Sequence, residues 1–254
     1  MNMNKNSNWV YGYHALRAAF ATHADSLDAL YLQAGRVDKR IDSIKLLAKE
    51  HGVVLNTLSA KSLQSLLGDG VVHQGMAASC NSPIDLVEAD LPLLLAAQKT
   101  PVVLILDCIQ DPHNLGACLR CANAFDVCAV IAPKDRSVAI NPTVKKVACG
   151  AADLTPFIQV TNLARTLKQL QADGLWLIGT DDIATENISQ VDMTGPIGIV
   201  MGNEGHGMRR LVRERCDFLA RIELPGDVSS VNVSVATGIC LYEVQRQRSA
   251  IVNP

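Results

Sequence analysis

The sequence predicts an α/β protein in which a parallel sheet, covered by helices on both faces, follows a smaller α/β domain. From Thr100 onward, short β-rich apolar segments alternate with helical ones, a pattern typical of parallel sheets. Before that point the composition changes over residues 81–99, where two prolines punctuate an acidic stretch. The chain has 254 residues, 48% of them hydrophobic, which is enough for a well-packed core.

The first domain is expected over residues 8–80. Its periodicity predicts helices at 14–20, 41–50 and 61–67, and strands at 27–32, 53–56 and 75–79. We interpret residues 81–99 as a linker with a short helix at its end. The second domain is then expected over residues 100–254.

The second domain repeats the strand-then-helix pattern. Strands are predicted at 102–107, 127–131, 157–160, 175–180, 197–201 and 218–224, and helices at 115–125, 143–151, 163–172, 208–215 and 237–247. Taken alone, this alternation predicts an ordinary doubly wound sheet, with ligands bound at the carboxyl ends of its strands.

Charge and hydropathy exclude several classes of protein. The formal net charge of −2 weighs against a protein that coats nucleic acid with its whole surface, yet it leaves room for a local basic face. Residues 1–9 are polar and lack the apolar core of a signal peptide, and the longest apolar runs are too short to span a bilayer. We therefore expect no membrane partner and a cytoplasmic location.

The eight cysteines are scattered, mostly within apolar periodic segments, which is typical of reduced, buried thiols. Cys118 and Cys121 form a single CxxC pair. A zinc site would need two more ligands at suitable spacing, and no second pair supplies them. We expect core thiols and no metal.

The first polar box, residues 106–120, leaves a buried strand and enters a helix. Asn114 lies near the expected helix start, where its side chain either caps the helix or faces a ligand. Arg120 follows among small apolar residues. Its guanidinium either reaches solvent or is aimed at an anion, for which phosphate is the natural partner.

The second box, residues 199–208, places three glycines at the mouth of a buried strand, where the backbone can approach a ligand closely. Their spacing differs from the G-x-G-x-x-G dinucleotide fingerprint. Glu204 is either a carboxylate at a helix start or a functional acid. His206 could be a general base or an ordinary loop histidine.

The third box, residues 224–236, runs from a β-rich segment straight into a helical pattern. Its Ser, Asn, Gly and Asp residues suit a turn and a helix cap, but they also suit ligand binding at a helix start. Ser230 and Asn232 are two residues apart, so in an extended segment their side chains face the same way.

Together the three boxes resemble the three signature motifs of the SpoU–TrmH branch of the SPOUT methyltransferases. The resemblance is carried by NLGACLR (114–120), MGNEGHGM (201–208) and SSVNVSVATGICLYE (229–243), and it extends to HQG (73–75), PKDRS (133–137), KKVACGAA (145–152) and VTNLART (160–166). It covers nearly the whole chain, and these further segments look like those of the 23S rRNA guanosine-2′-O-methyltransferases of this branch.

The resemblance implies a parallel sheet whose C-terminal segment threads a loop to form a trefoil knot, which strand pattern alone would not suggest. It implies S-adenosylmethionine as the methyl donor, bound largely through backbone groups at Gly202, Ile222, Leu224 and Val231. It places Asn114, Arg120, Glu204, Ser230 and Asn232 around the reacting centre. It also implies a homodimer in which two subunits complete each site.

The partner implied is 23S rRNA, with methylation of a guanosine ribose. The first domain resembles the small RNA-binding domain of the family. Basic residues expected to contact RNA are Arg36, Lys39 and Arg40 in the first domain and Lys134, Arg136, Lys145 and Lys146 in the second, although either group could be an ordinary solvated face.

The chain departs from the family pattern in its third box. Glu223 and Leu224 stand where related enzymes usually carry Pro and Met, and Val231 stands where Leu is usual. Backbone contacts to the cofactor should survive these changes. Two other readings stay open: an RNA-binding assembly factor that keeps the fold without catalysis, and a tRNA-directed relative. The complete set of five site residues weighs against the first, and the N-terminal domain against the second.

Overall fold

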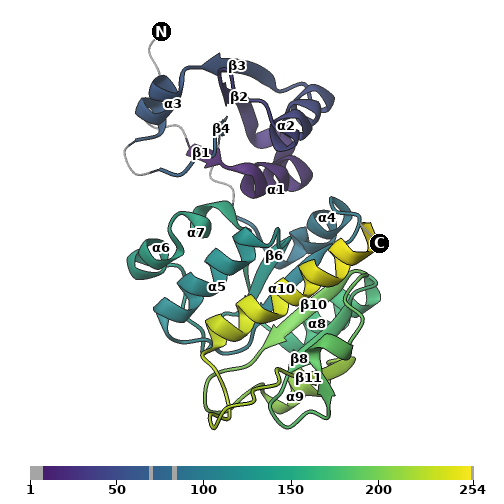
Figure 1. Ribbon diagram of the computed structural model, residues 1–254. Coiled ribbons are helices and arrows are strands. Elements are labelled where there is room, and N and C mark those ends of the chain that lie inside the picture. The colour runs from purple at the N-terminus through teal and green to yellow at the C-terminus, as the bar shows by residue number, and fades with distance from the viewer. Residues whose placement is uncertain (1–7, 69–70, 82–84, 253–254) are drawn as a thin grey trace. The chain divides into compact units, whose positions relative to one another are not determined.

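The computed structural model describes residues 8–68, 71–81 and 85–252, and the chain divides into two compact units between Leu86 and Val87 (Figure 1). Among the described residues, no helix is both long and apolar enough to cross a membrane.

The described part of the first unit contains a four-stranded sheet and three α-helices. Its elements are β1 (Asn8–Tyr11), α1 (Tyr13–His23), η1 (Ala24–Ser26), β2 (Leu27–Gln33), α2 (Lys39–Glu50), β3 (Val54–Leu58), α3 (Ala60–Leu67) and β4 (Met76–Cys80). The strand order is β1-β4-β2-β3, with only β2 and β3 parallel. Leu16 and Phe20 of α1 pack with Leu30 of β2 and Ile44 of α2 in its core.

All three predicted helices and three strands of this unit are present, but strand β1 was missed. β1 is only four residues long and half-buried, and it pairs antiparallel with β4 from Asn8↔Cys80 to Tyr11↔Ala77. A four-residue strand with an asparagine at its start gives no periodic signal, so pairing with β4 decides its conformation.

The second unit is a seven-stranded sheet with helices. Its elements are η2 (Glu88–Asp90), α4 (Leu91–Ala96), β5 (Val102–Leu106), α5 (Pro112–Ala124), β6 (Ala129–Pro133), α6 (Pro142–Ala148), α7 (Ala151–Leu154), β7 (Phe157–Val160), α8 (Leu163–Ala172), β8 (Trp176–Thr180), β9 (Glu186–Asn187), η3 (Ile188–Gln190), β10 (Ile197–Met201), α9 (Arg210–Arg213), β11 (Phe218–Arg221) and α10 (Val233–Val252). The short helix expected near the end of residues 81–99 is α4.

The predicted parallel sheet is confirmed: every strand pairs parallel with its neighbours in the order β7-β6-β5-β10-β8-β11-β9. β10 lies between β5 and β8, with Met201 beside Leu106. The loops that follow these three strands therefore emerge side by side at one edge of the sheet, the place where parallel sheets bind ligands.

Several predicted boundaries were wrong. The helix expected from 115 begins at Pro112, because Asp111 caps it by accepting the amide hydrogen of His113 (2.8 Å). The single helix expected at 143–151 is two helices, α6 and α7, because the backbone is left-handed at Cys149 (φ 51°) and Gly150 (φ 88°). The last strand ends at Arg221 rather than 224.

The last helix, α10, begins at Val233 instead of Thr237 and runs for 20 residues beside α5 (Figure 1). Between β11 and α10, the segment 222–232 runs beside residues 180–183 and 201–208, and these three segments together line one cavity, which is described below. The trefoil knot that the resemblance implies stays a prediction.

Candidate active site

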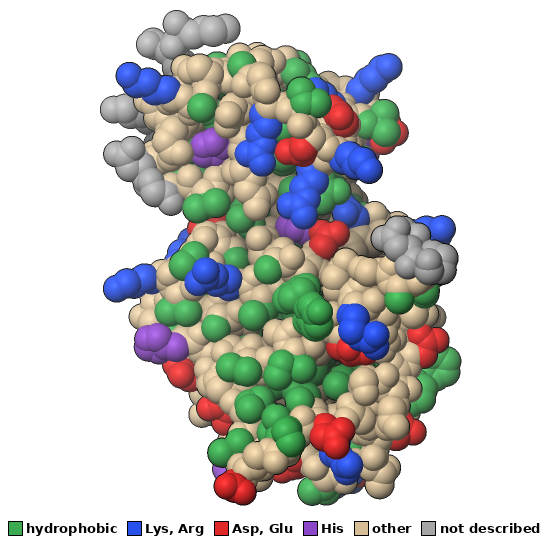
Figure 2. Space-filling model, in the orientation of Figure 1, with side chains coloured by type: hydrophobic (Ala, Val, Ile, Leu, Met, Phe, Trp, Pro, Cys, Tyr) green, Lys and Arg blue, Asp and Glu red, His purple; other side chains and the backbone are tan. Residues whose placement is uncertain are grey.

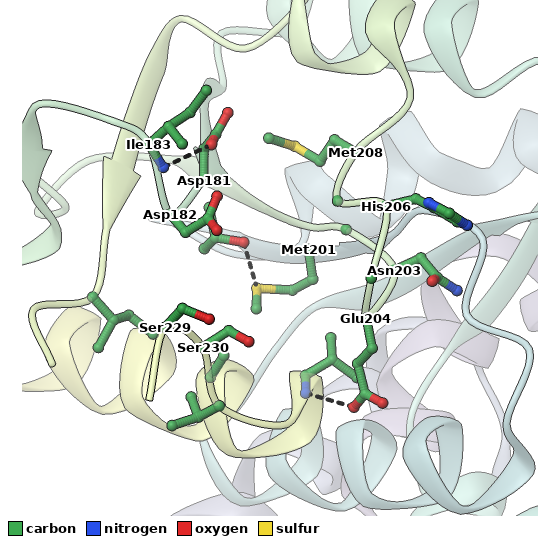
Figure 3. Close-up of a pocket in the computed structure, with 18 of the residues that line it drawn as sticks. Asp181, Asp182, Ile183, Met201, Asn203, Glu204, His206, Met208, Ser229 and Ser230 are labelled. Carbon is green, nitrogen blue, oxygen red and sulfur yellow. Dashed lines mark hydrogen bonds between the residues drawn. The ribbon is translucent and has the colours of Figure 1, made fainter. Parts of the chain in front are cut away.

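A cavity of about 590 Å³ lies at the carboxyl ends of β8 and β10 (Figure 3). This volume is within the usual range for small-molecule sites, roughly 300–1,000 Å³. In Figure 3, the loop 181–183 and the segment 229–230 form one side of the cavity, and the loop 203–208 forms the other. The four residues predicted to bind the cofactor all line the cavity: Gly202, Ile222, Leu224 and Val231.

Gly202 is at a position where no side chain fits. A Cβ atom added there would overlap the backbone of Gly207 and Met208, because the loop folds back on itself. The amide of Asn203 donates to the Gly207 carbonyl (3.0 Å), and the Gly207 amide donates back to the Asn203 carbonyl (2.9 Å). The loop is thus a tight hairpin whose backbone forms a wall of the cavity.

Glu204 gathers two of the other predicted site residues. Its Oε1 accepts hydrogen bonds from the side-chain amides of Asn114 (3.1 Å) and Asn232. The Asn232 amide also donates to Oδ1 of Asn114 (2.9 Å). Residues from all three polar boxes, up to 118 positions apart, therefore form one hydrogen-bonded cluster, which we call the Asn–Glu–Asn cluster (Asn114, Glu204 and Asn232).

The same cluster fixes the start of α10. Oε1 of Glu204 accepts the backbone amide hydrogen of Val233 (3.0 Å), and Oδ1 of Asn232 accepts that of Ser234 (2.9 Å). A carboxylate and an amide oxygen at a helix N-terminus satisfy otherwise unpaired amides and interact favourably with the helix dipole. Glu204 therefore orders both the cluster and the first turn of α10.

Asn114 is not the cap of α5, since Asp111 holds that position. The amide N–H of His113 lowers the pKa of the Asp111 carboxyl. Asn114 is instead buried in the first turn of α5, and its side chain is used for the cluster. Of the two alternatives left open by the sequence, the helix cap is therefore wrong, whereas a ligand-facing role stays a prediction, because Asn114 touches Glu204 and Asn232 but does not itself line the cavity.

Ser230 lines the cavity on the side opposite the 203–208 loop (Figure 3). The side chain of Asn232, two residues further along, points toward Glu204 and belongs to the Asn–Glu–Asn cluster. His206 also lines the cavity and is exposed.

Arg120 lies apart from these residues. It is exposed on α5 and does not line the cavity, and its Nη1 contacts the sulfur of Cys149 at 3.7 Å. The structure thus brings four of the five predicted site residues to one place within the chain and leaves the fifth outside.

The basic residues predicted to contact RNA in the second unit follow β6 or lie on α6. Lys134, Arg136, Lys145 and Lys146 are all exposed. Lys145 pairs with Asp153 (2.8 Å), so part of its charge is compensated within the fold.

In the first unit, Arg36, Lys39 and Arg40 are exposed around the start of α2. Arg36 pairs with Asp38 (3.2 Å), and the Arg40 guanidinium lies 5.4 Å from the ring centre of Tyr13. The ring was not singled out in the sequence; a cation over its face combines stacking surface and positive charge.

Cys118 and Cys121 both face the last helix, α10. The Cys118 sulfur lies 3.5 Å from Oγ1 of Thr237, and burial raises the pKa of its thiol to about 12. Among the described residues, no group of three or more His, Cys, Asp or Glu is arranged to hold a metal ion.

Two features of the site were missed in the sequence. The loop 181–183 lines the cavity, and Asp181 in it pairs with Arg213. Asp107 is fully buried at the end of β5 and pairs with Arg209 (2.7 Å). Asp181 directly follows the strand predicted at 175–180, and Asp107 is the last residue of the strand predicted at 102–107; a carboxylate at the carboxyl end of a parallel strand was the available signal.

Comparison with known proteins agrees with this geometry. Residues 101–242 match the SpoU rRNA Methylase family, and residues 9–85 match a family described as RNA 2'-O ribose methyltransferase substrate binding. The 23S rRNA (guanosine-2'-O-)-methyltransferase RlmB of Coxiella burnetii is 53% identical over 242 residues, which cover 95% of this chain and 96% of that protein. The protein of the same name from Escherichia coli K12 is 49% identical over 96% of this chain and 100% of its own length.

Among solved structures, the SpoU methyltransferase AviRb of Streptomyces viridochromogenes, in complex with the cofactor AdoMet, superimposes with a TM-score of 0.59. It is 22% identical, with 98% of this chain and 95% of that chain covered, and it therefore supports the fold alone. The family matches, the two near-full-length relatives and the convergence of the three polar boxes lead to one conclusion: the chain belongs to the SpoU rRNA methylase family.

Proposed function

We propose that this protein transfers a methyl group from S-adenosylmethionine to the ribose 2′-hydroxyl of a guanosine in 23S rRNA. The relatives that are about half identical over nearly the whole chain carry this activity in their names. The observation that carries the proposal in the structure is the Asn–Glu–Asn cluster beside a cavity of about 590 Å³.

The cavity suits the cofactor in size and in the chemistry of its walls. Gly202, Ile222, Leu224 and Val231 would hold it, with backbone groups exposed where Gly202 keeps side chains out. When bound, the sulfonium supplies an already activated methyl group, so that transfer needs placement of the acceptor and help with its proton.

Arg120 is the residue that we assign to the 2′-hydroxyl. A guanidinium stays protonated in proteins, so it acts as a clamp on the target phosphate and as a charge that stabilises the developing alkoxide, rather than as a base. Glu204 orients Asn114 and Asn232, and Ser230 offers a hydroxyl to cofactor or ribose from across the cavity.

We further propose a homodimer in which Arg120 acts at the cavity of the second subunit. Arg120 does not reach the cavity of its own chain. The face of α5 and α10 shows gathered hydrophobic side chains in Figure 2, and Val235 and Tyr242 of α10 are 51% and 60% exposed. A second copy would cover this face.

Mixing two inactive variants tests the shared site. In a mixture of Arg120→Ala and Glu204→Ala chains, a mixed dimer has one intact site if Arg120 acts across the interface, so random pairing restores about a quarter of wild-type activity. A dimer is expected by light scattering. Absence of any restored activity in a mixture shown to contain mixed dimers contradicts the shared site.

RNA binding is assigned to Lys134, Arg136, Lys145 and Lys146 of the second unit and to Arg36 and Arg40 of the first. Phosphate contacts from several of these residues would make affinity fall steeply with salt. The match of residues 9–85 to a substrate-binding family supports this role for the first unit.

The decisive experiment is ribose-methylation mapping of rRNA from cells with and without the gene, followed by methylation of 23S rRNA with purified protein. We expect one 2′-O-methylguanosine to disappear from 23S rRNA and to return in vitro. If a tRNA mark disappears instead, the substrate assignment is wrong. If no mark disappears and the purified protein binds RNA without methylating it, the protein is a non-catalytic binder.

A further inference from the structure

The loop that carries Glu204 is held at its far end by a buried carboxylate. Asp107 is 0% exposed and follows β5 directly. Its Oδ2 accepts the backbone amide hydrogen of Arg209 (2.8 Å), while its Oδ1 accepts Nε of the same residue (2.8 Å) and lies 2.7 Å from Nη2. A buried carboxylate is stable only when its charge and lone pairs are satisfied, and here a single residue satisfies both oxygens.

The near end of the same loop is held by Asn203. Its side-chain amide donates to the backbone carbonyl of Cys108 (2.8 Å), the residue after Asp107. Cys108 has a φ of 62°, in the left-handed region that non-glycine residues rarely occupy. Such a conformation persists where surrounding contacts determine it, and the bond from Asn203 is one of these contacts.

Both ends of the hairpin thus bind the same two residues at the end of β5. Between those ends lies Glu204, the acceptor for Asn114, Asn232 and the amide of Val233. A shift of the hairpin would move the Glu204 carboxylate away from all three donors together. It would also move the cavity wall that residues 202–208 form.

We propose that Asp107, Arg209 and Asn203 are positioning residues for methyl transfer: they fix the 203–209 loop on the end of β5, so that Glu204 holds Asn114 and the first turn of α10 beside the cofactor cavity. The inference rests on the proposed function for its kinetic consequence. Its structural consequence, an ordered start of α10, is independent of catalysis.

The test uses the full-length protein and two readouts. Asn203→Ala removes one donor without changing the backbone bridge to Gly207, and Asp107→Asn keeps the shape while removing the charge. Each should lower kcat/KM on the order of tenfold to a hundredfold, because small displacements of catalytic groups have effects of this size. In a Glu204→Ala background, Asn203→Ala should have almost no further effect, since both changes act through one group.

The second readout is amide hydrogen exchange of residues 229–236. We expect faster exchange at Val233 and Ser234 in Asn203→Ala, whether or not the variant is active, because the acceptor for Val233 is displaced.

A matched control is Asp217→Asn. Asp217 also binds a backbone amide, that of Leu177 (2.7 Å), and a side chain, that of Gln171 (2.8 Å), but it lies before β11, away from the cavity. The Asp217→Asn variant should be less stable than the wild type, but amide hydrogen exchange at residues 229–236 should be unchanged. Effects of Asn203→Ala and Glu204→Ala that simply multiply, or unchanged exchange at Val233, would overturn the inference. A wild-type protein that methylates no RNA would overturn the proposed function instead, leaving the exchange result to be judged on its own.

Discussion

Asn114 and Arg120 lie on the same helix, α5, and both are predicted to line the reacting centre, yet they are held in opposite ways. Asn114 is buried and bound to Glu204 and Asn232. Arg120 is exposed, and its Nη1 lies 3.7 Å from the sulfur of Cys149. If both residues belong to the site, as we propose, the difference separates a part that one chain orders by itself, around Asn114, from a part around Arg120 that RNA or a second chain would order.

The largest effect is expected at the loosely held half. Replacing Arg120 by Ala should lower turnover roughly 10²–10³-fold, the size seen when one group that stabilises developing charge is removed. Binding of S-adenosylmethionine should stay near wild type, since Arg120 does not line the cavity. Single-turnover kinetics and calorimetry measure the two quantities separately.

Arg165→Ala is the matched control, because Arg165 is also exposed on a helix and makes an ion pair with Glu88 (3.0 Å) remote from the cavity. Loss of cofactor affinity in Arg120→Ala would contradict the separation of Arg120 from the cofactor-binding part of the site.

A change in the ordered part of the site should instead weaken cofactor binding. In Gly202→Ala the new Cβ overlaps the backbone of Gly207 and Met208, so the hairpin must move. Such overpacking costs about 1–3 kcal/mol, and we expect it chiefly as weaker cofactor binding in calorimetry. Gly195→Ala serves as control, since a Cβ there meets open space. Equal cofactor affinity in the two variants would show that the hairpin wall is not rigid.

A smaller effect is expected on RNA affinity. Lys146→Ala should weaken binding a few-fold and reduce the slope of log K against log salt by about 0.7–0.9, the contribution of one phosphate contact. Lys168→Ala, an exposed lysine of α8, should leave the slope unchanged. Filter binding at several salt concentrations measures both, and a shared slope for the two variants would argue for a merely solvated face around α6.

The smallest effect concerns the first unit and pH. Burial, followed by the nearby Arg36, lowers the pKa of His73 below its usual value near 6.5. The Nδ1 of His73 also accepts the amide hydrogen of Gly75 (3.0 Å), which requires an unprotonated nitrogen. The unfolded chain therefore binds the proton more readily. Neutral His73 therefore stabilises the folded first unit fully above about pH 6.5, and this stabilisation is lost as the pH falls through and below that value.

Hydrogen exchange of β2, measured at several pH values in wild type and in His73→Gln, reports this. The substitution should remove the acid-dependent part of the exchange, and identical pH profiles would contradict the assignment.

Much of the fold followed from the sequence because its signals are local. The alternation after Thr100 predicted every strand of the parallel sheet except the two-residue β9. Helix α5 shows where local rules compete: Asn114 is a good cap, but Asp111 directly before Pro112 is the better one. The position of β10 between β5 and β8 could not be predicted, because pairing between strands far apart in sequence has no local signal.

For the site, the motifs identified Asn114, Glu204 and Asn232 but not their mutual hydrogen bonds, and they gave no indication that Arg120 lies outside the cavity. The pair of Asp107 and Arg209 was invisible for the same reason: its members are 102 positions apart, and each alone is an ordinary charged residue.

The late position of α10 in the chain has a consequence for biosynthesis. Cys240, Leu241 and Val244 of this helix are buried in the core of the second unit, and residues 222–231 supply part of the cavity wall. A nascent chain can therefore complete the first unit early, whereas it cannot form a cofactor site before residues 222–252 have left the ribosome. We expect that ribosome-bound chains lacking residues 222–252 cannot bind the methyl donor, because both a wall of the cavity and part of the core beneath it are missing.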